Sequence, residues 1–495
     1  MWRPLDASWR AIIYIRRMSD ELARVDAVGL AELIRRGDLS PLELIDDTIA
    51  RIERLNPQVN AVIHPAFEKA REVAAGDLPD GPFRGVPMLM KDLWPAEKGE
   101  PFHQGVQGLK NAGYCADLDA NIVTAYKRAG FVMSGRTNTP EMGLAATTEP
   151  VAYGPTRNPW DLERGSGGSS GGAAAAVAAG MLPAANASDG GGSIRIPAAM
   201  CGLVGLKPSR GRISMGPQRD EWGNSVQHVV SHTVRDSAAI LDATVAPFPG
   251  DGVIAPMPEK PFTDYIFDDP RPLRIGVLDR SIRDGIPIDP EVATAVRTIA
   301  DQLEQLGHVV LDESPPALDD QELIASYGAQ WTAAVATSLE TFGEWIGREL
   351  TEDDVEPMTW ALAQRGRKMG AIEAARAGER AMTFRHRMAD WWAGSADLLL
   401  APTCLRPAPL IGESAGTADN PFANVHVTLA YSTLTAPFNS TGQPAVSLPL
   451  AQSSTGLPIG IQFVAAYGRE DLLLQVAGQL ERALPWAHTR APMHP

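Results

Sequence analysis

Apolar side chains recur at intervals of three and four residues early in the chain, at Leu42, Ile45, Ile49 and Ile52. This spacing predicts one buried face of an amphipathic helix. The segment Ser40-Pro41-Leu42-Glu43 predicts the start of that helix, because the serine can cap it, the proline fits the first turn and the glutamate completes a capping box. We expect the helix to end near Asn56-Pro57, and residues 20–75 as a whole to form helices packed on the main body.

Further along the chain, patterns typical of strands alternate with patterns typical of helices. Helical spacing occurs at 292–306 and 470–484, and most of 325–387 reads as helix. A segment rich in proline and aspartate, 247–272, is expected to be a surface excursion. Strands are predicted at 129–134, 203–206, 274–278, 309–311, 397–403 and 457–464. Such alternation indicates an α/β fold, and no internal repeat interrupts it.

Composition and charge narrow the functional class. The chain has 495 residues, 44% of them hydrophobic, and a formal net charge of −16, which argues against nucleic acid or an anionic membrane as a partner. The cysteines Cys115, Cys201 and Cys404 form no paired motif, so a reducing, cytoplasmic location is expected. No arrangement typical of metal ligands is evident, and no cofactor is expected.

The first residues carry Arg16-Arg17, but no apolar stretch follows them, so we expect neither a signal peptide nor a membrane span. Residues 1–19 are therefore predicted to be a disordered N-terminal extension, with Met18 as an alternative start.

The most informative motif is the run from Ser188 to Pro197, in which Gly190, Gly191 and Gly192 directly precede Ser193. Glycine backbones can turn several N–H groups toward one point. A hydroxyl beside convergent N–H donors suits acyl transfer, since the hydroxyl attacks a carbonyl and the N–H groups hold the developing oxyanion. Taken alone, the run is equally consistent with a tight turn or a linker.

Two further motifs lie upstream, Gly165-Ser166-Gly167-Gly168-Ser169-Ser170-Gly171-Gly172 and the apolar run 85–90 that ends in Lys91-Asp92. Together the three motifs resemble the amidase signature family, whose catalytic Ser–Ser–Lys set matches Ser193, Ser169 and Lys91. The apolar lead-in suggests that Lys91 is buried, and desolvation would lower its pKa so that it can accept a proton. Ser169 would then relay the proton of Ser193.

The resemblance implies a single domain over residues 20–490, with a large mixed twisted sheet covered by helices on both faces. It also implies that Asp189 and Arg195 hold the glycine loop and that the Gly168–Ser169 peptide is cis. The family commonly has a branched residue where this chain has Gly190. The N–H groups of Gly190, Gly191, Gly192 and Ser193 are the predicted oxyanion hole.

Within the family, residues 147–160, 350–356, 437–444 and 465–471 resemble the 6-aminohexanoate cyclic-dimer hydrolases. This favours small linear or cyclic amides, including nylon-type 6-aminohexanoate oligomers, as substrates. Trp222 and Trp331 are the candidate pocket residues, although either can equally be core.

Other functions stay open at this stage. They are a glutamine-hydrolysing amidotransferase A-type subunit, an aryl or alkyl acylamidase with esterase side activity, and a non-catalytic binding protein; a homodimer also stays open. Residues 167–171 match the G-x-S-x-G elbow of α/β-hydrolases, but that elbow needs a central strand before it, which residues 158–165 cannot form.

Overall fold

The computed structural model describes residues 20–219, 223–423 and 425–495. The predicted extension at 1–19 and the candidate pocket residue Trp222 lie outside the described residues.

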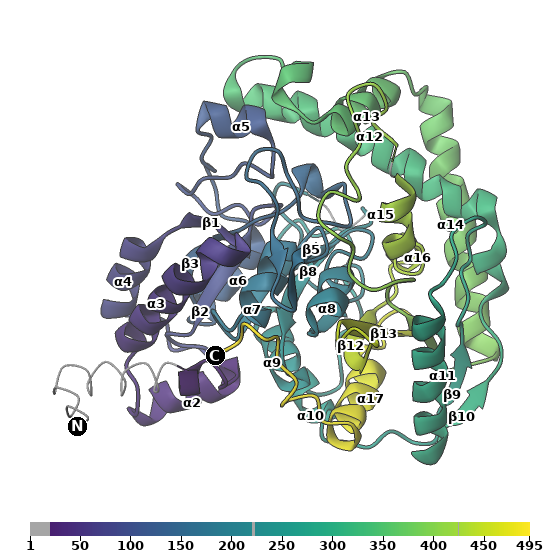
Figure 1. The fold of residues 1–495 in the computed structure, drawn as a ribbon, viewed down its shortest axis with the longest axis horizontal. Helices are drawn as coiled ribbons and strands as arrows, with labels where there is room; N and C mark the ends of the chain where they lie inside the picture. Colours follow the sequence, from purple (N-terminus) through teal and green to yellow (C-terminus); the bar gives the residue numbers. More distant parts are fainter. Residues whose placement is uncertain (1–19, 220–222, 424) are drawn as a thin grey trace, which may run out of the picture.

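An eight-stranded mixed sheet organises the chain (Figure 1). Its first three strands run parallel to one another, and the remaining pairs are antiparallel. In spatial order the strands are β10 (Val309–Leu311), β9 (Arg274–Val277), β11 (Leu398–Pro402), β13 (Pro458–Ala465), β12 (Ala445–Gln452), β7 (Val204–Lys207), β8 (Val226–Ser231) and β6 (Ala184–Asp189).

A three-stranded sheet of β1 (Val62–Pro65), β3 (Val132–Thr137) and β2 (Pro87–Lys91) extends this arrangement. The end of β2 lies beside β6, since the Lys91 N–H donates to the side chain of Asn186 at 3.3 Å. A separate hairpin joins β4 (Arg157–Asn158) to β5 (Asp161–Gly165).

Helices cover both faces of the sheets. Neighbouring residues of a strand point to opposite faces, so the buried clusters on the two faces can be told apart. Met88 and Val229 belong to one buried cluster, whereas Leu89 and Val230, each one residue further on, belong to another. The first cluster includes residues of α2 (Ala27–Arg36), α6 (Asn121–Arg128), α9 (Val234–Thr244), α11 (Pro290–Gln305) and α17 (Glu470–Ala483). The second includes residues of α3 (Pro41–Val59), α7 (Gly171–Ala178) and α8 (Arg195–Cys201). The predicted α/β fold is therefore confirmed.

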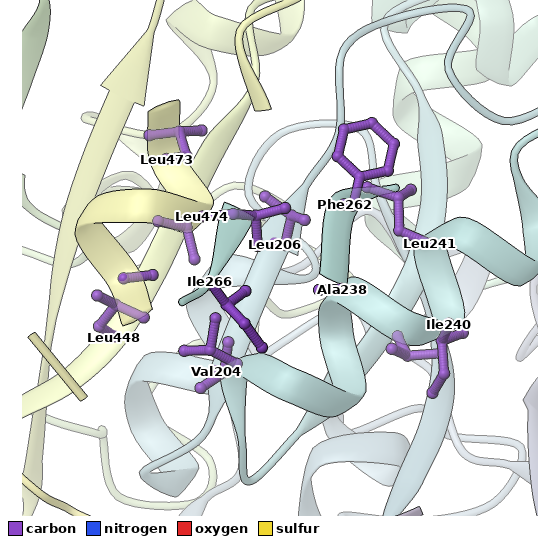
Figure 2. Packing of buried hydrophobic residues seen from close by; sticks show 14 of the residues in the cluster. Val204, Leu206, Ala238, Ile240, Leu241, Phe262, Ile266, Leu448, Leu473 and Leu474 are labelled. Carbon is purple, nitrogen blue, oxygen red and sulfur yellow. The ribbon is translucent and has the colours of Figure 1, made fainter. Parts of the chain in front are cut away.

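Part of the first cluster joins segments that are far apart in the sequence (Figure 2). Leu473 and Leu474 of α17 pack with Leu206 of β7 and Leu448 of β12. The C-terminal helix thus covers strands from both halves of the chain. These strands lie next to the segments that carry the candidate site.

The segment predicted to be mostly helical forms α12 (Gln321–Ile346), α13 (Pro357–Arg367) and α14 (Ala371–Gly394), which line one end of the molecule (Figure 1). Shorter helices complete the structure: α4 (Phe67–Ala75), α5 (Gln107–Ala112), α10 (Phe262–Tyr265), α15 (Val425–Ser432) and α16 (Pro437–Thr441). Every helix in the described part of the chain is too short or too polar to span a bilayer.

The predicted start of α3 is confirmed, since the Ser40 side chain accepts from the Glu43 N–H and Glu43 accepts from the Ser40 N–H. Its predicted end is wrong. The helix continues through Pro57 to Val59 and ends at Asn60, whose N–H donates to the Asn56 carbonyl.

The expectation that 20–75 is entirely helical is also wrong, because β1 interrupts it. Four residues are too few for a strand pattern to stand out, and β1 is held by long-range pairing with β3.

Candidate active site

Lys91 ends strand β2 with its side chain entirely buried. Its Nζ lies 2.7 Å from Ser169 Oγ and 2.9 Å from Ser188 Oγ. Burial lowers the pKa of Lys91 well below its ordinary value, although the Asp189 carboxylate partly opposes this effect. A lysine in this position is suited to the neutral form, in which it can accept a proton.

The strand end that presents Lys91 is fixed from behind by a buried ion pair. Arg136 donates to the Lys91 carbonyl at 3.0 Å and to the Asp92 carboxylate at 3.1 Å. Burial raises the pKa of Asp92 to about 6, against the opposing effect of Arg136. The pair therefore holds the backbone of β2 where Lys91 leaves the strand.

Ser169 lies in the loop between β5 and α7, after a cis Gly168–Ser169 peptide bond. The next residue fastens this loop to β6, because Ser170 Oγ donates to the Ser188 carbonyl and accepts from the Ser188 N–H, both at 3.2 Å. At Gly143, a Cβ atom would lie only 3.0 Å from Ser169 Oγ. Ser169 is therefore packed against Lys91 on one side and a glycine backbone on another.

Ser193 lies two residues before α8 and is half-buried. It lines a cavity of about 580 Å³ that Gly191, Tyr327 and Trp331 also line. Of the predicted trio, the structure thus places Lys91 and Ser169 in contact, and it places Ser193 on a cavity wall. Gly168, the residue before Ser169, lines the same cavity.

The Asp189 carboxylate is the anchor of the glycine loop. It accepts from the Gly192 N–H at 2.7 Å and the Ile194 N–H at 3.2 Å, and Arg195 donates to both of its oxygens at 2.9 Å. Although burial favours the neutral acid, the Arg195 guanidinium holds the pKa of Asp189 far below its ordinary value. The side chains of Asp189 and Arg195 therefore meet beneath the loop and connect to its backbone.

The same guanidinium reaches the C-terminal part of the chain. Arg195 donates to Gln462 Oε1 and to Asn439 Oδ1, both at 2.7 Å. Asn439 in turn donates to the Asp189 carbonyl and carboxylate, both at 2.9 Å. The sequence did not predict that Asn439 and Gln462 hold this loop. Its one pointer was that Asn439 lies within the segment 437–444, which resembles the 6-aminohexanoate cyclic-dimer hydrolases.

The carbonyl groups of the loop are held on the other side. Tyr327 Oη donates to the Gly190 carbonyl at 2.5 Å, and Thr435 Oγ1 donates to the Gly191 carbonyl at 2.7 Å. Since the N–H of a residue points opposite to the preceding carbonyl in a trans peptide, these bonds fix the direction of the Gly191 and Gly192 N–H groups. Tyr327 and Thr435 are further residues that sequence reasoning missed.

Neighbouring side chains leave no room for a side chain at position 190. A Cβ at Gly190 would lie 2.9 Å from Ser225 Oγ, 3.2 Å from Trp331 and 3.3 Å from Trp94. The two indoles thus occupy the space beside the Gly190 backbone that a side chain would need.

The backbone of Trp94 is strained, because its φ of 78° is one that residues other than glycine rarely adopt. The Arg219 guanidinium lies 4.9 Å from its ring centre. Trp94 and Trp331 line a second cavity of about 740 Å³, which adjoins the Ser193 cavity at Leu144 and Trp331. Trp331 is therefore a wall residue of both cavities, and its role in a substrate pocket stays a prediction.

The structure argues against the G-x-S-x-G elbow. The strand before the G-x-S-x-G match, β5, pairs only with β4 in a two-stranded hairpin and is not central. Histidine is the usual base for a serine nucleophile, but the histidines next along the chain from Ser193 are engaged elsewhere, since His228 contacts Ser237 and His232 contacts the Val177 carbonyl. Across 20–219, 223–423 and 425–495, no three histidine, cysteine or carboxylate side chains are grouped to hold a metal ion.

Comparison with known proteins gives a consistent result. The family model described as Amidase matches residues 43–474. The 6-aminohexanoate-cyclic-dimer hydrolase of Paenarthrobacter ureafaciens is 46% identical over 474 residues, which cover 94% of this chain and 96% of that enzyme.

Solved structures agree with these matches. A 6-aminohexanoate cyclic dimer hydrolase complexed with substrate has a TM-score of 0.92 and 45% identity, covering 96% of this chain and 100% of that one. A bacterial aryl acylamidase of the amidase signature family has a TM-score of 0.83 and 27% identity, covering 94% and 97%.

Proposed function

The chain belongs to the amidase family, and on that premise we propose that it hydrolyses small carboxamides through an acyl-enzyme on Ser193. Ser169 is the proton relay and Lys91 the final proton acceptor. The observation that carries the proposal is the 2.7 Å distance between Lys91 Nζ and Ser169 Oγ, made by a lysine that is entirely buried. An unactivated serine is a poor nucleophile and needs a base. In this proposal the neutral amine of Lys91 is that base, and the Ser169 hydroxyl links it to Ser193.

In the acylation step, Ser193 Oγ attacks the amide carbonyl carbon. Its proton passes to Ser169 Oγ, which gives its own proton to Lys91 Nζ. The carbonyl π electrons move to the oxygen, and N–H groups of the glycine loop stabilise that oxyanion. Because the Gly192 N–H donates to Asp189 at 2.7 Å, we assign the oxyanion contacts to the remaining predicted donors, Gly190, Gly191 and Ser193.

Collapse of the intermediate breaks the C–N bond. The relay then runs in reverse, so that the leaving amine receives a proton from Ser169, which recovers one from Lys91. Water attacks the resulting ester in the same way and loses its proton to the relay, and Ser193 recovers a proton as the acid leaves. Proton count is conserved over the cycle, and Lys91 returns to the neutral form.

For the substrate, we propose a small, uncharged or weakly charged amide, linear or cyclic, including 6-aminohexanoate oligomers. The support is the 46% identity to a 6-aminohexanoate-cyclic-dimer hydrolase over 94% of this chain and a cavity of about 580 Å³ beside Ser193. Trp331 limits that cavity, and one methylene of fit there changes discrimination by roughly 10–200-fold.

The mechanism is tested by Ser193→Ala, with Ser454→Ala in an exposed turn as the matched control. The first variant should lose all measurable amine release while keeping its melting temperature, and the control should match the wild type. A fluorophosphonate followed by peptide mass spectrometry should label Ser193. Labelling of Ser169 in its place contradicts the assignment.

The substrate class is tested separately by amine release from five compounds: the 6-aminohexanoate cyclic dimer, its linear dimer, a short aliphatic amide, an anilide and glutamine. Turnover of either dimer supports the nylon-oligomer proposal, and turnover of neither refutes it while leaving the amidase assignment intact. Glutamine as the one good substrate indicates an amidotransferase-type subunit.

A further inference from the structure

A third cavity, of about 700 Å³, lies apart from the proposed catalytic residues. Its wall comes from the loop after β7, residues 252–253, helix α14, and the segments after α16 and β13. Neither Ser193, Ser169 nor Lys91 lines it. The cavity therefore needs an explanation other than the amide site.

Two arginines face this cavity without a carboxylate. Arg210 is only 9% exposed, and its Nη2 donates to the neutral carbonyls of Asn439 at 2.7 Å and Ser440 at 3.1 Å. Its Nε is buried with no hydrogen-bond partner. Arg385, on α14, lines the same cavity, and neither arginine forms an ion pair within the described part of the chain.

The contrast with a neighbouring residue shows that this is unusual. Arg212, two positions after Arg210, is buried to a similar degree and pairs with Glu470 at 2.9 Å. For Arg210, burial first and the nearby Arg385 charge second lower the pKa to about 10. Two like charges at one cavity, one of them desolvated, favour a bound anion between them.

The rest of the wall is mainly apolar and aromatic, with His386, Thr441 and Gln443 as its other polar residues. Val253, Ala389 and Tyr467 line it, and so does Trp392, whose indole Nε1 is buried without a partner. The buried polar atoms without a partner here, Arg210 Nε and Trp392 Nε1, are thus N–H donors, and no side-chain carboxylate lines the cavity. This combination suits a ligand with one negative charge and an apolar body, rather than a strongly hydrated inorganic anion.

We propose that this cavity binds an amphipathic carboxylate, with its carboxylate between the guanidinium groups of Arg210 and Arg385 and its apolar body against Trp392 and Val253. The site does not depend on the proposed amidase mechanism. Binding there and hydrolysis at Ser193 are therefore separately testable.

The test is isothermal titration calorimetry of the full chain with 4-phenylbutyrate, 4-phenylbutanol and inorganic phosphate. Saturable binding of the acid with at least about ten-fold preference over the alcohol is expected, because a charge-assisted hydrogen bond is lost in the alcohol. Phosphate should give no saturable heat. No saturable binding of the acid, or equal binding of acid and alcohol, overturns the proposal, and tighter binding of phosphate overturns the carboxylate assignment.

The variants locate the ligand. Arg385→Gln should weaken 4-phenylbutyrate binding at least about ten-fold, and Ala389→Trp should abolish it by filling the cavity. Arg283→Gln is the matched control, because Arg283 lines the Ser193 cavity. If Arg283→Gln weakens binding and Arg385→Gln does not, the acid occupies the catalytic cavity and the proposal is wrong. Melting temperatures confirm that each variant is folded, and Arg210 is left intact because it also holds Asn439.

Discussion

Replacing Arg195 with lysine separates the role of its charge from the role of its shape. The guanidinium donates four hydrogen bonds of 2.7–2.9 Å, two to Asp189, one to Gln462 and one to Asn439. A lysine ammonium keeps the charge, but it is a point donor and cannot reproduce this planar fork. We therefore expect Arg195→Lys to leave about two of the four acceptors without a partner.

The magnitude follows from the burial of the pair, since both side chains are 0% exposed. A hydrogen bond to a charged group contributes about 1.5–3 kcal/mol, so two lost bonds destabilise the fold by about 3–6 kcal/mol. That is a large part of the 5–15 kcal/mol by which domains are typically stable. Since Asp189 also accepts from the Gly192 and Ile194 N–H groups, the glycine loop should lose its geometry, and kcat should fall about 100-fold or more with a smaller change in KM.

The assay combines differential scanning fluorimetry with steady-state amine release. Arg36→Lys is the control, because Arg36 pairs with Asp38 at 3.0 Å while 64% exposed, and its melting temperature and kcat should match the wild type. An Arg195→Lys enzyme with the stability and kcat of the wild type would refute the reasoning, because charge alone would then hold the loop.

Other predictions concern the base and the loop. Activity should rise with pH as Lys91 loses its proton, and Lys91→Arg should be inactive because a guanidinium stays protonated; near-normal rates in that variant exclude Lys91 as the base. Because the folded pKa of Lys91 lies below its ordinary value of 10.5, the unfolded chain binds the extra proton between the two values, so stability rises with pH across that window. Lys91→Met should make this slope shallower in urea titrations at several pH values, with the buried Lys207 accounting for part of what remains. Tyr327→Phe removes the donor to the Gly190 carbonyl and should lower kcat by about five- to ten-fold with little change in KM, whereas an unchanged kcat means that Tyr327 does not position the loop. Gly191→Ala would drive a methyl group into Tyr327 Oη, and kcat should fall about 100-fold or more while the melting temperature changes by a few degrees; a fully active variant contradicts the packing described above.

Local sequence patterns predicted much of this structure. The capping box at Ser40 and Glu43 is present, and the strand predicted at 274–278 is β9. These features depend on residues close together in the chain, where periodicity and turn chemistry act directly. The three motifs and the resemblance they carry also pointed to Lys91 and Ser169, whose side chains are in contact, while their catalytic role stays a prediction.

What the sequence did not predict depends on contacts between distant segments. Asn439 and Gln462 reach Arg195 from 244 and 267 residues away, and no local pattern marks either residue. Tyr327 and Thr435 act on the loop through single hydroxyl groups, which are common in any helix or turn. The same limit applies to β1, whose four residues form a strand only because β3 lies beside them.

The network beneath the glycine loop also has a consequence for how the chain is made. Synthesis proceeds from the N-terminus, and domains fold progressively as they emerge. All three proposed catalytic residues precede residue 200, whereas Asn439 and Gln462, which hold Arg195, belong to the last sixth of the chain. A partly synthesised chain therefore carries the reactive side chains without the support that orients them. The contacts of Arg195 with Asn439 and Gln462 can form only after the C-terminal segment has joined the sheet, so the order of synthesis places completion of this network late in the assembly of the fold.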